Sequence, residues 1–126
     1  MTSTIDNFEI SKTLGSGFSA KVKLAKDEDG NQYALKIFDL GNKHNNERAM
    51  KYLKNEVQMT MNLSHKHIVK YHKFEEKTHW IRSNGKSNPV AYIAQEPVLG
   101  GELFDYVANS GSFSEPMCRY FFKQLL

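Results

Sequence analysis

Leu14-Gly15-Ser16-Gly17-Phe18-Ser19-Ala20-Lys21-Val22, followed by Ala34-Leu35-Lys36, is the stretch that decides the fold. Gly15 and Gly17 lack a Cβ, so the backbone there can adopt unusual dihedrals and approach a ligand closely. The bare amides of such a loop can bind phosphate oxygens. After the loop, Lys21-Val22-Lys23-Leu24 alternates as a β-strand does. The loop therefore joins two strands, whereas a dinucleotide-binding loop would open a helix.

A lysine and a glutamate occupy positions where a charge is unexpected. Lys36 lies inside an apolar strand, where an unpaired charge is unfavourable. Glu56 falls on the apolar face of a helical pattern over residues 46–63. Glu56 could instead be a surface residue that pairs with Lys51 or Lys54. Because each of the two unexpected charges supplies the partner that the other lacks, we predict a salt bridge between Lys36 and Glu56.

The hydrophobic periodicity predicts a chain of five strands and one long helix. Two short helices follow the last strand. Residues 1–7 are expected to form a flexible tail, residues 39–46 a polar connection and residues 82–89 a turn-rich loop. The strands are predicted at residues 8–15, 21–26, 32–38, 71–81 and 90–95, and the helices at 46–63, 102–109 and 114–126.

Composition limits the class of protein. The chain has 126 residues, 25% charged and 40% hydrophobic, which suits one modest globular domain. Its net charge of +3 suggests a lysine-rich surface and no nucleic-acid partner. The single cysteine, Cys118, excludes an internal disulfide and fits a reducing compartment. No apolar run is long enough to span a membrane and no secretory signal is apparent, so we expect a cytoplasmic protein without a membrane partner.

His65 and His67 form the one histidine pair that could suggest a metal site. Further ligands would have to come from other elements, and the sequence offers no cysteine or carboxylate at a matching spacing. Histidines without such companions seldom bind metal, so we expect no metal site in this chain.

The glycine loop, Ala34-x-Lys36 and Glu56, in this order, resemble the N-terminal lobe of the eukaryotic protein kinase family. The resemblance covers residues 8–126. It implies an α+β fold in which one long helix lies against a five-stranded antiparallel sheet, followed by the first short helices of a second lobe. The string Gly100-Gly101-Glu102-Leu103-Phe104-Asp105-Tyr106 is similar to the calcium/calmodulin-dependent and AMP-activated-like serine/threonine kinases. The third glycine of the family's loop is Ala20 here, which implies a stiffer loop.

The resemblance implies roles for individual residues, with ATP and Mg as cofactors and a protein as substrate. Lys36 and Glu56 would be catalytic, with Glu56 holding Lys36 on the α- and β-phosphates. The Glu96 carbonyl and the Val98 amide would bind the adenine edge, and Glu102 would lie near the ribose and the incoming peptide. The residues implied in nucleotide binding are Leu14, Gly15, Ser16, Gly17, Phe18, Ser19, Ala20, Val22, Ala34, Lys36, Glu96, Val98 and Glu102.

The resemblance also implies a division of the chain into a kinase N-lobe with its hinge at 8–99 and the start of a truncated C-lobe at 100–126. The family's catalytic base and metal ligands lie in His-Arg-Asp and Asp-Phe-Gly motifs, which this sequence lacks. We therefore expect the ATP-binding portion of a serine/threonine kinase, which transfers the γ-phosphate to protein hydroxyls only when the C-lobe is present. The alternative is a non-catalytic, stand-alone lobe that binds nucleotide or a partner.

The last predicted helix is apolar around most of its circumference. Phe121, Phe122, Leu125 and Leu126 leave it few polar positions, and the sequence stops there without a capping residue. This favours a fragment over a stand-alone lobe. Contiguous exposed apolar patches drive association, so we expect this helix to be loosely ordered or to mediate self-association.

Overall fold

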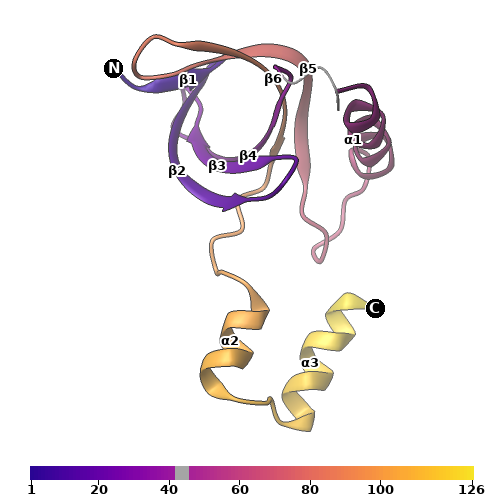
Figure 1. Cartoon of the computed structure of the whole chain (residues 1–126). Helices are drawn as coiled ribbons and strands as arrows, with labels where there is room; N and C mark the ends of the chain where they lie inside the picture. Colours follow the sequence, from indigo (N-terminus) through magenta and orange to yellow (C-terminus); the bar gives the residue numbers. More distant parts are fainter. Residues whose placement is uncertain (42–45) are drawn as a thin grey trace.

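The computed structural model describes residues 1–41 and 46–126, so part of the predicted 39–46 connection, residues 42–45, lies outside the described residues. Figure 1 shows strands that curve into a ring, a helix beside the ring and a pair of helices that follow it. Within the described ranges the elements are β1 (Ser3–Ile5), β2 (Phe8–Ser16), β3 (Lys21–Lys26), β4 (Gln32–Asp39), α1 (Asn46–Thr60), β5 (Tyr71–Ile81), β6 (Ser87–Gln95), α2 (Leu103–Ser110) and α3 (Glu115–Leu125).

The strands form a closed sheet in the order β1-β2-β3-β4-β6-β5, and every neighbouring pair is antiparallel. The predicted antiparallel sheet with a long helix and two short ones is confirmed. The strand number was wrong, because six strands are present in the described part of the chain and five were predicted. The additional strand is β1, and it closes the ring by pairing with both β2 and β5.

The N-terminal residues therefore form part of the sheet, which corrects the prediction of a flexible tail at residues 1–7. Ile5 is fully buried inside the ring and pairs with Phe8 across the turn. Asp6 has a φ of 50° in that turn, a conformation that aspartate tolerates better than most residues. Its two carboxylate oxygens accept hydrogen bonds from the hydroxyls of Thr78, at 2.5 Å, and Tyr92, at 2.7 Å. These contacts with distant strands hold the N-terminal hairpin in place.

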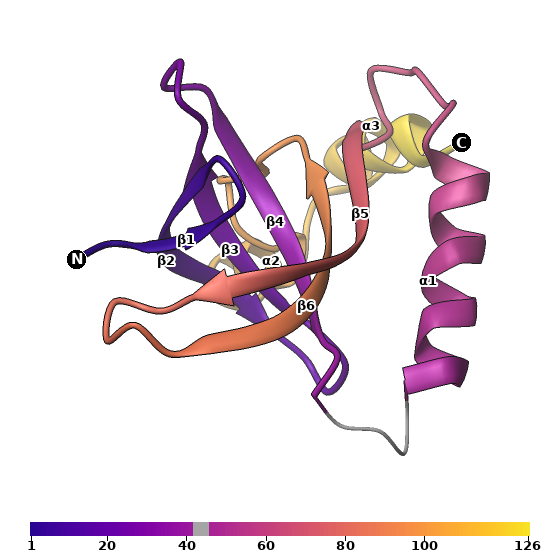
Figure 2. The same ribbon diagram turned by 90° about the horizontal axis from the view of Figure 1, so that it is seen from above.

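Two apolar cores lie on opposite faces of the sheet. The interior of the ring is filled by side chains such as Phe8, Leu35 and Tyr92. On the outer face, Leu53 of α1 packs against Ala91 and Ile93 of β6. Figure 2 shows α1 running alongside the outside of the ring, next to β5. Since successive side chains of a strand point to opposite faces, one strand can contribute to both cores.

The final two helices carry no buried residue among those that the structure describes. In Figure 1 they stand apart from the ring, joined to it by the segment after β6. Phe113 and Phe121 stack with ring centroids 5.6 Å apart, while Phe122 and Leu125 are exposed. The self-association expected of this helix stays a prediction. No helix within residues 1–41 or 46–126 has the length and hydropathy needed to cross a membrane.

Candidate functional site

The strand β4 and the helix α1 bring the two unexpected charges together. The Nζ of Lys36 lies 3.3 Å from the Oε1 of Glu56, which confirms the predicted salt bridge. The side chains are 30% and 38% exposed, so the pair is accessible to a ligand as well as to water. Lys36 is anchored in the middle of β4, opposite Val22 of β3 and Ile93 of β6. Glu56 follows Leu53, whose burial against β6 fixes the face that α1 presents.

Tyr71, the first residue of β5, completes this cluster, and the sequence analysis did not identify it. Its hydroxyl donates a hydrogen bond to Glu56 Oε1 at 2.5 Å. Burial, and then the hydrogen bond and the negative charge of Glu56, raise the pKa of Tyr71 above its ordinary value. Glu56 is thus held from two sides, by a cation and by a neutral donor. An aromatic residue at the start of a strand was the only signal in the sequence, and it does not specify this contact.

The predicted apolar residues lie next to Lys36 through the strand register. Val22 is directly opposite Lys36 in the ladder between β3 and β4. Ala34 lies two residues before Lys36 on the same face of β4 and is 2% exposed. Ala34 also pairs with Gln95 at the end of β6. The outer face of the sheet therefore offers a small apolar surface between the lysine and the segment that follows β6.

The glycine loop closes through a backbone hydrogen bond from the Gly17 amide to the Ala20 carbonyl, at 2.9 Å. A Cβ added at Gly15 would have no neighbour within 4 Å, and one at Gly17 would meet only the Ala20 carbonyl oxygen, at 3.8 Å. The protein's own packing therefore does not require glycine at these positions. A ligand that approaches the backbone closely would supply such a requirement. Phe18 at the tip is fully exposed, and Ser16 and Ser19 are exposed beside it.

The segment after β6 is fixed at Glu96. The Glu96 amide donates to the Lys70 carbonyl at 2.8 Å, and the Lys70 amide donates to Glu96 Oε2 at 3.1 Å. Within residues 1–41 and 46–126, no protein group hydrogen-bonds the Glu96 carbonyl or the Val98 amide. Val98 is 57% exposed. This segment therefore presents one acceptor and one donor that a ligand can use.

Two other predicted site residues, Leu14 and Glu102, are less directly connected to the cluster around Lys36. Leu14 is half-buried near the end of β2, immediately before Gly15, which pairs with Val22. Glu102 is exposed and lies in extended conformation just before α2. No hydrogen bond or ion pair in the described part of the chain joins Glu102 to the cluster around Lys36.

No group of three metal-ligating side chains occurs among the residues that the structure describes. The rings of His65 and His67 meet edge-on, with centroids 5.2 Å apart, and His65 Nδ1 accepts a hydrogen bond from the His67 amide. That nitrogen is therefore engaged in a local turn.

Comparison with known proteins identifies the family. The model of the protein kinase domain matches residues 8–126. CBL-interacting protein kinase 9 of Oryza sativa subsp. japonica is 32% identical over 99% of this chain, and CBL-interacting serine/threonine-protein kinase 9 of Arabidopsis thaliana is 35% identical over 97%. The SNF1-related protein kinase catalytic subunit alpha KIN12 of Arabidopsis thaliana is 32% identical over 100% of the chain.

The chain covers 25%, 25% and 24% of these three relatives, respectively, so it spans about a quarter of their length. The family resemblance inferred from the glycine loop and the lysine–glutamate pair is confirmed by these matches. The chain belongs to the protein kinase family.

Proposed function

We propose that this chain is the ATP-binding portion of a serine/threonine protein kinase. The observation that carries the proposal is the Lys36–Glu56 ion pair at 3.3 Å, on the same face of the sheet as Val22 and Ala34. In kinases a strand lysine paired with a helix glutamate holds the α- and β-phosphates of the nucleotide. The names of the relatives, which are serine/threonine or SNF1-related kinases, support the same reaction class.

In the proposed complex, the adenine lies against Val22 and Ala34 beside Leu14. The Glu96 carbonyl and the Val98 amide, both without a protein partner in the described part of the chain, bind the adenine edge. The backbone amides of residues 15–20, including those of Ser16, Phe18 and Ser19, cover the phosphates. Glu102 contacts the ribose or the incoming peptide.

Lys36 supplies the positive charge that the phosphates need, and Glu56 with Tyr71 keeps its Nζ in place. Glu56 acts through Lys36, and Tyr71 acts through Glu56. Both are therefore positioning residues in this chain. A lysine without such support would sample many rotamers, and the conformational entropy lost on ordering it would oppose nucleotide binding.

The described residues do not fit a bound Mg ion. They contain no cluster of three metal-ligating side chains, and the sequence lacks the Asp-Phe-Gly and His-Arg-Asp motifs. We propose that residues 8–99 form the N-lobe with its hinge and residues 100–126 the start of the second lobe. Transfer of the γ-phosphate to a protein Ser or Thr hydroxyl then requires a catalytic base and metal ligands from outside these 126 residues.

A second candidate is a stand-alone lobe that binds nucleotide or a partner without catalysis. The closed sheet favours it, because β1 covers the interior and both faces of the sheet are packed. Both candidates share nucleotide binding and differ in phosphoryl transfer, so an activity assay on a longer chain separates them.

A fluorescent ATP analogue tests the shared step. We expect saturable binding by the wild-type chain and weaker binding by Lys36→Ala. Lys51→Ala is the matched control, because Lys51 is an exposed lysine on α1. Equal affinity of the wild type and Lys36→Ala would refute the proposed role of Lys36.

A further inference from the structure

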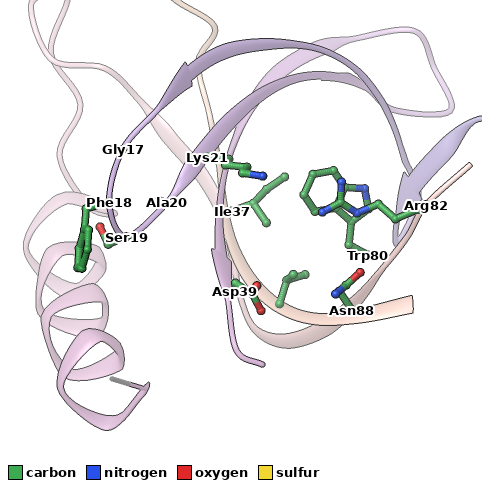
Figure 3. A pocket seen from close by; sticks show the side chains of 11 residues that line it. Gly17, Phe18, Ser19, Ala20, Lys21, Ile37, Asp39, Trp80, Arg82 and Asn88 are labelled. Carbon is green, nitrogen blue, oxygen red and sulfur yellow. The ribbon is translucent and has the colours of Figure 1, made fainter. Parts of the chain in front are cut away.

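A pocket of about 220 Å³ opens at one mouth of the ring, beside the glycine loop. Figure 3 shows the side chains of Lys21 and Arg82 pointing toward each other over Trp80, with Asp39 and Asn88 along the lower rim. Lys21 and Lys23 lie on the face of β3 opposite to Val22, since side chains alternate along a strand. The pocket therefore lies on the face of the sheet opposite to Lys36, and residues 17–20 of the glycine loop also line it.

Two cations, Lys21 and Arg82, line this pocket, and a third, Lys23, lies near its Trp80 ring. The Arg82 guanidinium stacks on the Trp80 ring at 3.4 Å from its centroid, and the Lys23 Nζ lies 5.9 Å from the same centroid. Burial lowers the pKa of Lys23, and the charges of Lys21 and Arg82 lower it further. Lys21 lines the pocket next to Arg82. The positive charge of Lys23 is thus disfavoured by its two cationic neighbours.

The protein does not neutralise this cluster. Among the described residues, none of the three cations has a carboxylate within 4.0 Å. Lys23 donates to the neutral hydroxyl of Thr13. The Arg82 Nε is shielded from solvent and has no hydrogen-bond partner in the part of the chain that the structure describes. A shielded donor without an acceptor is unfavourable, so the Arg82 guanidinium lacks a partner that would offset its burial.

The pocket contains one opposing charge. Asp39 lines it, but its Oδ1 already accepts a hydrogen bond from the Gly41 amide at 2.8 Å. Lys21 and Arg82 against Asp39 leave the lining with a net positive charge, to which Lys23 near the Trp80 ring adds. Asn88, on the same rim, has a side-chain amide that can donate to an oxygen.

We propose that this pocket binds a phosphate monoester, either a small free one or a phosphorylated side chain. An arginine fork suits the oxygens of a phosphate group, and the ammonium group of Lys21 can bind the remaining charge. A single carboxylate would carry about half the charge of a phosphate monoester.

Trp80 is the only tryptophan of the chain, so its intrinsic fluorescence reports directly on this pocket. The nucleotide-free 126-residue chain is titrated with inorganic phosphate, with O-phosphoserine and with a phosphoserine peptide, at constant ionic strength maintained with NaCl. We expect a saturable change with phosphomonoesters and none with chloride. Tighter binding of the peptide than of O-phosphoserine would indicate that the ligand is a phosphorylated side chain of a polypeptide. Equal affinities would indicate a small free monoester.

Substitutions of the lining residues test whether the phosphate monoester binds in this pocket. Lys21→Gln and Arg82→Gln should each bind O-phosphoserine at least roughly tenfold more weakly, whereas Asp39→Asn should bind it more tightly. Lys26→Gln is the control, because Lys26 is an exposed lysine on the same strand that does not line the pocket. Lys21 is exposed, so replacing it leaves the fold intact. The Lys21→Gln variant therefore tests the proposal even if the Arg82→Gln variant fails to fold. Equal affinities in Lys21→Gln and wild type, or no saturable change in wild type, would overturn the proposal.

Discussion

Tyr71→Phe tests the account of the charged cluster, because it removes a single oxygen. In the wild type, the Tyr71 hydroxyl donates to Glu56 Oε1 at 2.5 Å, while Lys36 contacts the same oxygen at 3.3 Å. Phenylalanine keeps the aromatic packing of this residue against the core under α1. The variant therefore separates the hydrogen bond from the apolar contact.

The magnitude follows from the exposure of the partners. A hydrogen bond to a charged group contributes about 1.5–3 kcal/mol when it is shielded. The Glu56 side chain is 38% exposed, so water replaces part of the lost bond. We therefore expect a loss of about 1 kcal/mol in the free energy of unfolding. For a domain of this size, that corresponds to a fall in Tm of roughly 3–6 °C.

The same variant has a distinct pH signature. The pKa of Tyr71 is raised in the folded chain from its ordinary value of 10.0. The unfolded chain releases this proton above about pH 10 while the folded chain keeps it, so the contribution of Tyr71 is complete below pH 10 and decreases above it. The difference in stability between wild type and Tyr71→Phe should therefore be constant at neutral pH and shrink above pH 10.

Urea unfolding followed by circular dichroism, at several pH values, measures both effects. Tyr52→Phe is the matched control, since Tyr52 is 66% exposed on α1. It should leave the unfolding free energy unchanged at neutral pH. A Tyr71→Phe variant as stable as wild type, with the same dependence on pH, would refute the reasoning that Tyr71 anchors Glu56.

Three further predictions concern other parts of the chain. Deleting residues 1–7 should lower the free energy of unfolding by at least about 1.5–3 kcal/mol, the value of burying one isoleucine, because Ile5 is fully buried; unchanged urea denaturation would show that β1 contributes nothing. The purified 126-residue chain should incorporate no phosphate into a basic peptide, and turnover that disappears in Lys36→Ala would contradict this. Deleting residues 114–126 should abolish self-association in light scattering, since Phe122 and Leu125 are exposed; a monomeric wild type with strongly protected α3 amides would argue against that role.

Local patterns were sufficient for most of the fold. The predicted strands 21–26 and 71–81 have the same bounds as β3 and β5. For β3 the signal was the alternating polarity of residues 21–24, which is typical of a strand with two different faces. The Lys36–Glu56 contact could be predicted because two charges in apolar surroundings each lacked a partner. The signal in that case was an inconsistency in the sequence, which only a tertiary contact resolves.

Contacts between distant residues were missed, since no local pattern encodes them. Tyr92 is 86 residues from Asp6, and its hydroxyl hydrogen-bonds the turn that positions β1. The three residues of β1 are too few to show a period. β6 begins at Ser87, three residues before the predicted start, although Pro89 disfavours a strand. The pairing of Trp80 with Asn88 and of Ile81 with Ser87 overrides that local preference.

Backbone amide chemical shifts of the isotopically labelled chain, measured with and without ATP, test the central claim most directly. If the chain is the nucleotide-binding portion of a kinase, ATP should shift the amides of residues 15–20 and of Lys36 and Val98, and adenosine alone should shift Val98. In Lys36→Ala, the ATP shifts should require a higher ATP concentration. Shifts confined to the surroundings of Trp80 and Arg82, or no shifts at all, would contradict the claim.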